Sequence, residues 1–155
     1  MRKKQAPKRL ITPDPRHGDR VIGKFVNNLM WDGKKSVAYT IIYNAFDIVE
    51  EKMEESGLDV FRRALSNTMP AVEVRSRRVG GATFQIPAEI REDRKQALGM
   101  KWLIRYARLR TGKSMKEKLA NEIMDASNGE GASVRKKIET HRMAEANKAF
   151  SHFRF

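Results

Sequence analysis

The chain of 155 residues has no cysteine and only three histidines. Disulfides and thiolate metal sites are therefore excluded, and His17, His141 and His152 form no HExxH or other spaced metal motif. No apolar run approaches the roughly 18 residues of a membrane-spanning helix, and no apolar segment follows the basic N-terminus as in a secretory signal. We expect no metal or other cofactor, and no membrane as a partner.

Enzyme motifs are missing as well. Gly112-Lys113-Ser114 lacks the upstream glycine of a phosphate-binding loop and follows no predicted strand, and no G-x-S-x-G motif occurs. There is also no cluster of acids of the kind that holds two catalytic metal ions. The sequence therefore predicts a protein that is not an enzyme.

Positive charge is what the chain has in excess. It contains 32 Lys and Arg against 19 Asp and Glu, a net charge of +13. Such a surplus attracts polyanions, and nucleic acid is the first expected partner. An anionic membrane surface comes second on charge alone, but the apolar helix faces are committed to a core. The acids crowd residues 47–59 and are scarce around residues 101–118. This asymmetry predicts one acidic surface, in water or against a basic neighbour, and one surface that meets the polyanion.

Helical periodicity accounts for most of the chain. Amphipathic helices are predicted at about residues 19–31, 36–55, 59–69, 91–110, 114–128 and 133–150. Ser36, Asp59 and Ser114 are the expected N-caps of the second, third and fifth helices, and Gly33 and Gly57 the expected ends of the first and second. Residues 1–16 hold six cations, one acid and three prolines, which indicates an extended basic arm.

A β-hairpin is predicted between the third and fourth helices, with Val79-Gly80-Gly81-Ala82 as its turn, because glycine adopts the positive φ angles that such turns need. Arg77 then faces Phe84, and Arg75 faces Ile86. Neither face is cleanly apolar, which favours a projecting arm. Three arginines near the tip suggest contact with a phosphate backbone: Arg75, Arg77 and Arg78. Phe84 either stacks on a base or braces the hairpin.

The fold class that follows is mainly α. It is a bundle of about six helices with a projecting two-stranded β-hairpin arm at residues 72–88 and basic extensions, all within one domain of residues 1–155. On the fourth helix, Arg94, Lys101, Arg105 and Arg108 fall within one narrow stripe. An unpaired row of cations costs stability by repulsion, so the stripe is easier to explain if an anion neutralises it. Trp31, at the end of the first helix, is ambiguous between packing and stacking.

The type of nucleic acid stays open on these grounds. A β-arm on a helical body suits architectural DNA-binding proteins, which lay β-ribbons in the minor groove. Against that reading, no proline wedge stands at the turn and no recognition helix stands out. Basic extensions that order on binding are common in RNA assemblies.

Six motifs in order carry a family resemblance. They are FVNNLM at residues 25–30, DGKKS at 32–36, VEVRSRRVGG at 72–81, KSM at 113–115, LANE at 119–122 and HRMAEANKAF at 141–150. In these motifs, which span nearly the whole chain, the sequence resembles the bacterial-type small-subunit ribosomal protein seven family. The resemblance implies a structural constituent of the small subunit in the cytoplasmic ribosome, which binds the 3′ major domain of the rRNA and nucleates assembly of the head.

The resemblance also implies further partners and a set of RNA contacts. The β-arm would lie near the exit site, close to tRNA and mRNA, and neighbouring small-subunit proteins would touch the chain. Gly80 and Gly81 would form the turn of that arm. The expected RNA-binding side chains are Arg2, Lys3, Lys4, Lys8, Arg9, Lys34, Lys35, Arg75, Arg77, Arg78, Arg94, Lys101, Arg105, Arg108, Arg110, Lys113, Lys116, Lys136 and Arg142.

Overall fold

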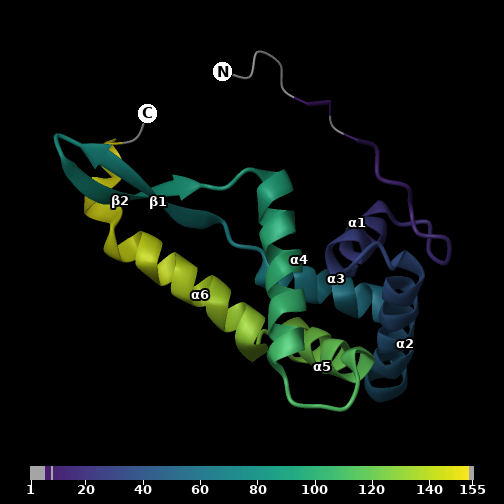
Figure 1. The fold of residues 1–155 in the computed structure, drawn as a ribbon. Coiled ribbons are helices and arrows are strands. Elements are labelled where there is room, and N and C mark those ends of the chain that lie inside the picture. Colours follow the sequence, from purple (N-terminus) through teal and green to yellow (C-terminus); the bar gives the residue numbers. More distant parts are fainter. Residues whose placement is uncertain (1–5, 8, 154–155) are drawn as a thin grey trace.

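The computed structural model of the protein describes residues 6–7 and 9–153. Within them, six α-helices and one β-hairpin confirm the predicted fold class. The elements are α1 (Arg20–Leu29), α2 (Lys35–Met53), α3 (Gly57–Thr68), β1 (Val72–Val79), β2 (Ala82–Glu89), α4 (Glu92–Leu109), α5 (Met115–Ser127), α6 (Gly131–Ala146) and a 3-10 helix, η1 (Lys148–Phe153). Helix α4 runs from the base of the hairpin to the loop before α5 (Figure 1).

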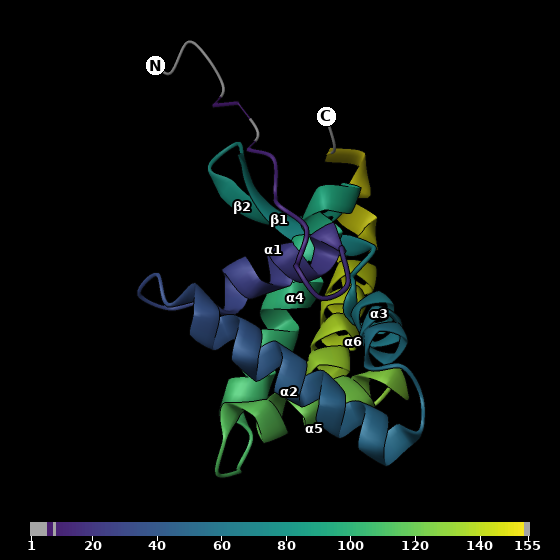
Figure 2. The same cartoon turned by 90° about the vertical axis from the view of Figure 1, so that its right-hand side faces the viewer.

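Helix α5 packs against α2, α3, α4 and α6 and so joins much of the bundle. In the second view it lies next to α2 at the bottom (Figure 2). Three phenylalanines that the sequence assigns to the core are fully or almost fully buried: Phe25, Phe46 and Phe61. The Phe61 ring lies 4.8 Å from that of Phe25 and 5.5 Å from that of Phe46, centroid to centroid. Burial of each such side chain stabilises the fold by about 1.5–3 kcal/mol.

The hairpin has the predicted turn and register. Gly80 and Gly81 have φ angles of 58° and 92°, which only glycine adopts without strain. Arg77 is paired with Phe84 and Arg75 with Ile86, as expected. The register therefore follows from the turn residues alone.

The arm projects from the bundle, but it does not project alone. Helix α6 and η1 run beside it (Figure 1). Ile86 is only 5% exposed, and the rings of Phe84 and Phe150 lie 5.4 Å apart, centroid to centroid. Phe84 therefore braces the hairpin, which is one of the two roles expected from the sequence.

Several helix ends differ from the prediction. Gly57 does not end α2 but begins α3. Its role is steric: a Cβ at this position would lie 2.9 Å from Cβ of Phe46, so only glycine fits so close to α2. Helix α2 ends earlier, at Met53, where Glu54 turns left-handed with a φ of 55°. Helix α1 likewise ends at Leu29, before Gly33.

Two of the three predicted caps were wrong. Lys34 rather than Ser36 precedes α2, and Ser56 rather than Asp59 precedes α3. Ser114 does precede α5, but its hydroxyl makes no capping hydrogen bond. Packing between helices sets these ends, and local capping patterns do not report it.

Candidate nucleic-acid interface

Helix α4 carries two exposed cations side by side. Lys101 and Arg105 are one turn apart and exposed, and neither has an ion-pair partner among residues 6–7 and 9–153. Together with Asn28 and Arg108 they line a shallow groove of about 350 Å³. Two neighbouring cations without a carboxylate form the kind of surface that binds phosphate.

The other two cations of the predicted stripe, Arg94 and Arg108, have partners within the protein. The expectation of four unpaired cations was therefore wrong. Arg94 donates to both carboxylate oxygens of Glu73 on β1, at 2.8 and 3.0 Å. The guanidinium of Arg108 lies 4.6 Å from the centroid of the Trp31 ring and donates to the Leu29 carbonyl at 3.1 Å. The protein itself therefore offsets part of the repulsion within the stripe.

The arginines of the hairpin stay largely exposed. Arg75 pairs with Glu73 at 2.8 Å, yet 60% of its side chain is in contact with solvent, and Arg77 and Arg78 are exposed nearer the tip. Hydrogen bonds from Arg94, and then from Arg75, hold the pKa of Glu73 below its usual value although burial opposes this. The carboxylate therefore stays charged and fixes the base of the arm.

Lys34 lies in the loop between α1 and α2, and Lys35 is the first residue of α2. Asp32 and Gly33 reverse the chain there, with φ angles of 50° and 71°. Lys34 is exposed, and the Lys35 ammonium lies 5.7 Å from the centroid of the Tyr39 ring. Lys34 therefore lies at a surface turn, where phosphate contacts form, and Lys35 lies half-buried beside it.

Beyond α4, the predicted contacts divide in two. Lys113 and Lys116 are exposed around the start of α5. Arg110 instead points inward: it donates to the fully buried Glu122 at 2.6 Å and also to Asp125. The structure thus gives Arg110 an internal role, and its contact with RNA remains a prediction.

Helix α6 carries the last two predicted contacts. Lys136 pairs with Glu139 at 2.7 Å, and Arg142 is exposed. His141 beside it accepts a hydrogen bond at Nε2 from the backbone N–H of Ala71, at 2.9 Å. Burial, with the charge of Lys137, lowers the pKa of His141, so the ring is a neutral acceptor that ties α6 to the start of the hairpin.

The N-terminal arm is anchored by a residue that sequence reasoning missed. Asp14 is 2% exposed and accepts hydrogen bonds from the backbone N–H groups of Arg16, His17 and Asp19 and from the Tyr43 hydroxyl. Burial, and then this hydrogen bond, raise the pKa of Tyr43. The available signal was that Asp14 is the single acid of a basic arm and is followed by a turn-forming proline.

Of the predicted RNA contacts in the N-terminal arm, Arg9 lies within the described residues and the other four do not. Arg9 is exposed. Arg2, Lys3, Lys4 and Lys8 lie outside the described residues.

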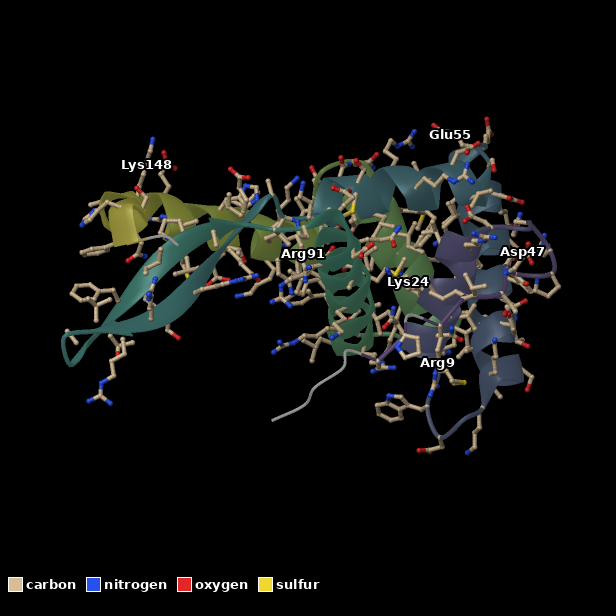
Figure 3. The ribbon with its side chains drawn as sticks, turned by 90° about the horizontal axis from the view of Figure 1, so that it is seen from above. Arg9, Lys24, Asp47, Glu55, Arg91 and Lys148 are labelled. Atoms are coloured by element: carbon tan, nitrogen blue, oxygen red, sulfur yellow. The ribbon has the colours of Figure 1, made fainter. Side chains whose placement is uncertain are left out.

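Acidic side chains gather elsewhere. Asp47 and Glu55 of the α2 region lie at the end of the molecule away from the hairpin and from Lys148 (Figure 3). Arg16 pairs with Asp47 at 2.9 Å, and Arg63 pairs with Glu55 at 2.9 Å. The charge asymmetry read from the sequence is therefore also an asymmetry in space.

The described residues contain no group of three or more His, Asp or Glu side chains that could hold a metal ion. Nor is any helix in this part of the chain both long and apolar enough to cross a membrane.

Comparison with known proteins decides the family. The sequence model of the family described as "Ribosomal protein S7p/S5e" matches residues 1–148. The chain belongs to this family. Its relatives include three proteins that are each named "Small ribosomal subunit protein uS7". The one from Cytophaga hutchinsonii is 63% identical, the one from Flavobacterium psychrophilum 60%, each over the full length of both chains, and the one from Caldanaerobacter subterraneus 56% over 99% of both.

Membership of the S7p/S5e family confirms the resemblance that the motifs indicated. A structural, non-enzymatic constituent of the small ribosomal subunit agrees with both the family and the exposed cations. RNA binding is general for such proteins, so the described basic side chains form the candidate interface.

Proposed function

We propose that the whole chain, residues 1–155, acts as one rRNA-binding domain that binds the 3′ major domain of the small-subunit rRNA directly and nucleates assembly of the head. The observation that carries this proposal is the pair Lys101 and Arg105, exposed on α4 and without a carboxylate partner in the described part of the chain. Cations of this kind release counterions from phosphates and supply sequence-independent affinity.

The mechanism is scaffolding. Contacts between cations and phosphates position RNA helices on a protein surface without reading their sequence. Further exposed cations come from other elements: Lys34 in the loop before α2, and Lys113 and Lys116 around the start of α5. Lys35, the half-buried first residue of α2, lies beside Lys34. A rigid bundle that presents them at fixed separations holds the RNA segments in one arrangement.

The hairpin extends this role. Its base is fixed by the ion pair between Glu73 and Arg94, and Phe150 braces Phe84, so the Gly80-Gly81 turn is held away from the bundle. We place this arm near the exit site, beside tRNA and mRNA, with Arg75, Arg77 and Arg78 toward RNA. The acidic end of α2 would then be free to meet a basic neighbouring protein of the small subunit in the cytoplasmic ribosome.

The test is binding of the full chain to the small-subunit rRNA 3′ domain across a salt series, with duplex DNA as competitor. We expect binding that survives DNA competition at physiological salt. The double variant Lys101→Gln, Arg105→Gln should weaken it, and the slope of log affinity against log salt should fall by about two, since each phosphate contact contributes about one.

The matched control removes two charges from another part of the surface. Lys52→Gln with Arg63→Gln lowers the net charge equally, but both residues lie near the acidic end of α2. It should change the slope much less. Equal slopes in both double variants would show that only net charge matters, and equal affinity for RNA and duplex DNA would favour an architectural DNA-binding protein instead.

A further inference from the structure

An apolar groove lies beside the basic strip of α4. It has a volume of about 390 Å³ and is formed by the end of α1, the start of α2, α4 and the start of α5. Leu29 and Ala38 are buried in its floor, whereas Trp31 and Val37 at its wall are 68% and 52% exposed. A large aromatic side chain left in solvent at a groove suggests an occupant, because burial of such a side chain is strongly favourable.

Trp31 is held in place although it is exposed. The Arg108 guanidinium stacks on the indole ring, 4.6 Å from its centroid, and donates to the Leu29 carbonyl at 3.1 Å. Arg108 therefore joins the ring to the end of α1. A ring fixed in this way loses little further entropy when a partner stacks on it.

Arg108 is also the wall between two different surfaces. On one side lies the apolar groove with Trp31; on the other lies the groove of about 350 Å³ that contains Lys101 and Arg105. Lys34 adds a cation to the apolar groove, and no carboxylate from the described residues lines either groove. The two grooves together present a flat apolar surface next to a cluster of positive charge.

This combination favours one kind of occupant. A nucleotide joins a flat π-face to a phosphate, and so it complements both grooves at once. An apolar peptide segment would fill the first groove but leave Lys101 and Arg105 without a partner. A duplex would satisfy the cations, but its bases stay stacked in the helix and cannot reach Trp31.

We propose that an unpaired nucleobase of the rRNA inserts into this groove and stacks on Trp31, while its neighbouring phosphates contact Lys101, Arg105 and Arg108. The proposal rests on the function proposed above and adds a base contact to a surface otherwise made of phosphate contacts. Stacking platforms with cation rims are a recurrent way to hold single-stranded nucleic acid.

The first experiment uses Trp31 as its own reporter. The only other tryptophan is Trp102, so Trp102→Phe leaves Trp31 as the single source of indole fluorescence. We expect quenching when the small-subunit rRNA 3′ domain is added, because a stacked base quenches an indole. Trp31→Ala should weaken binding roughly 5- to 150-fold, the cost of one base–aromatic stack, with an unchanged salt slope. Trp31→Phe should recover most of the affinity.

A thermodynamic cycle with abasic RNA identifies the base and supplies the control. Removal of one unpaired base from the RNA should weaken the wild type as much as Trp31→Ala does, and should have no added effect on that variant. Ile138→Ala, which removes another exposed apolar side chain from α6, should bind normally. Melting curves of each variant check that it is folded.

The outcomes separate the two proposals. Loss of wild-type binding to the rRNA domain would overturn the proposed function. Tight wild-type binding with no quenching of Trp31 and no loss in Trp31→Ala would leave that function intact and overturn the base-stacking proposal, as would an equal loss in Trp31→Ala and Ile138→Ala.

Discussion

Glu73 on β1 and Arg94 on α4 form a two-pronged ion pair across 21 residues of sequence, with Nη2 to Oε2 at 2.8 Å and Nε to both oxygens at 3.0 Å. Arg75 donates to the same carboxylate at 2.9 Å. The base of the arm is therefore fixed to the start of α4 through one acid that serves two of the predicted RNA-binding arginines. Two cations held by one carboxylate keep a net positive charge for a partner.

Glu73→Gln should loosen the arm without unfolding the bundle. Half of the Arg94 side chain is exposed, at 51%, so the pair contributes only about 0.2–1 kcal/mol. We expect little change in the melting temperature but faster amide hydrogen exchange at residues 72–76. Glu92→Gln, which removes an exposed pair with Lys95 on α4, is the control. Unchanged exchange in Glu73→Gln would mean that the strand pairing alone holds the base.

Acid should release the other tie between the arm and the bundle. The neutral Nε2 of His141 accepts the N–H of Ala71, and burial, with Lys137, lowers the pKa of His141. With the folded pKa below the unfolded value of about 6.5, this contact stabilises the fold fully above that value and less as pH falls through the folded pKa. Melting curves between about pH 5 and pH 7.5 should show the loss.

His141→Gln tests the assignment. An amide oxygen can still accept the Ala71 N–H but does not titrate in this range. We expect this variant to keep most of its stability at neutral pH and to lose part of the pH dependence. Retention of the full pH dependence in His141→Gln would assign it to another group.

Features set by residues close together in the sequence could be predicted, whereas features set by contacts between distant helices could not. The turn at Gly80-Gly81 and the register of the hairpin were right because they are decided by neighbouring residues. The predicted start of α3 was wrong. Glycine is needed at position 57 because of its close approach to Phe46, which lies on another helix. Local patterns do not carry such contacts.

The candidate site divides in the same way. That Lys101 and Arg105 share an exposed face follows from helical periodicity and was correctly predicted. The inward direction of Arg110 was not predicted, because its partner Glu122 lies twelve residues later on α5. An acid within an apolar stripe does not indicate which cation it pairs with. Trp31 stayed ambiguous because its groove combines four helices.

Asp14→Asn should free the N-terminal arm. The buried carboxylate accepts four hydrogen bonds, and an amide would turn donors toward some of these N–H and O–H groups. We expect a loss of about 1–3 kcal/mol and faster cleavage by trypsin after Arg16. Asp32→Asn, in the exposed loop before α2, should be cleaved as the wild type. Equal cleavage of all three proteins would show that the arm is held by other contacts, such as the approach of Thr12 to Gly23.

Glu122 connects the end of α4 with the start of α6, and Glu122→Gln should be the most destabilising of these changes. This fully buried carboxylate accepts from the backbone N–H of Ser133 at 3.0 Å, from the Ser133 hydroxyl at 2.6 Å and from Arg110 at 2.6 Å. Removal of its charge leaves Arg110 with Asp125 alone, and a broken buried pair costs about 3 kcal/mol. Urea denaturation should therefore show a lower midpoint with an unchanged slope.

Glu117→Gln, on the exposed side of the same helix, provides the comparison and should stay within about 0.5 kcal/mol of the wild type. Arg110→Gln should resemble Glu122→Gln in stability, because it removes the other half of the pair. If Arg110 acts only inside the protein, its variant should also keep the full salt slope of rRNA binding at temperatures where it is folded. A slope lowered by about one would instead show that Arg110 reaches a phosphate, and a Glu122→Gln midpoint equal to that of Glu117→Gln would show that Asp125 alone can hold Arg110.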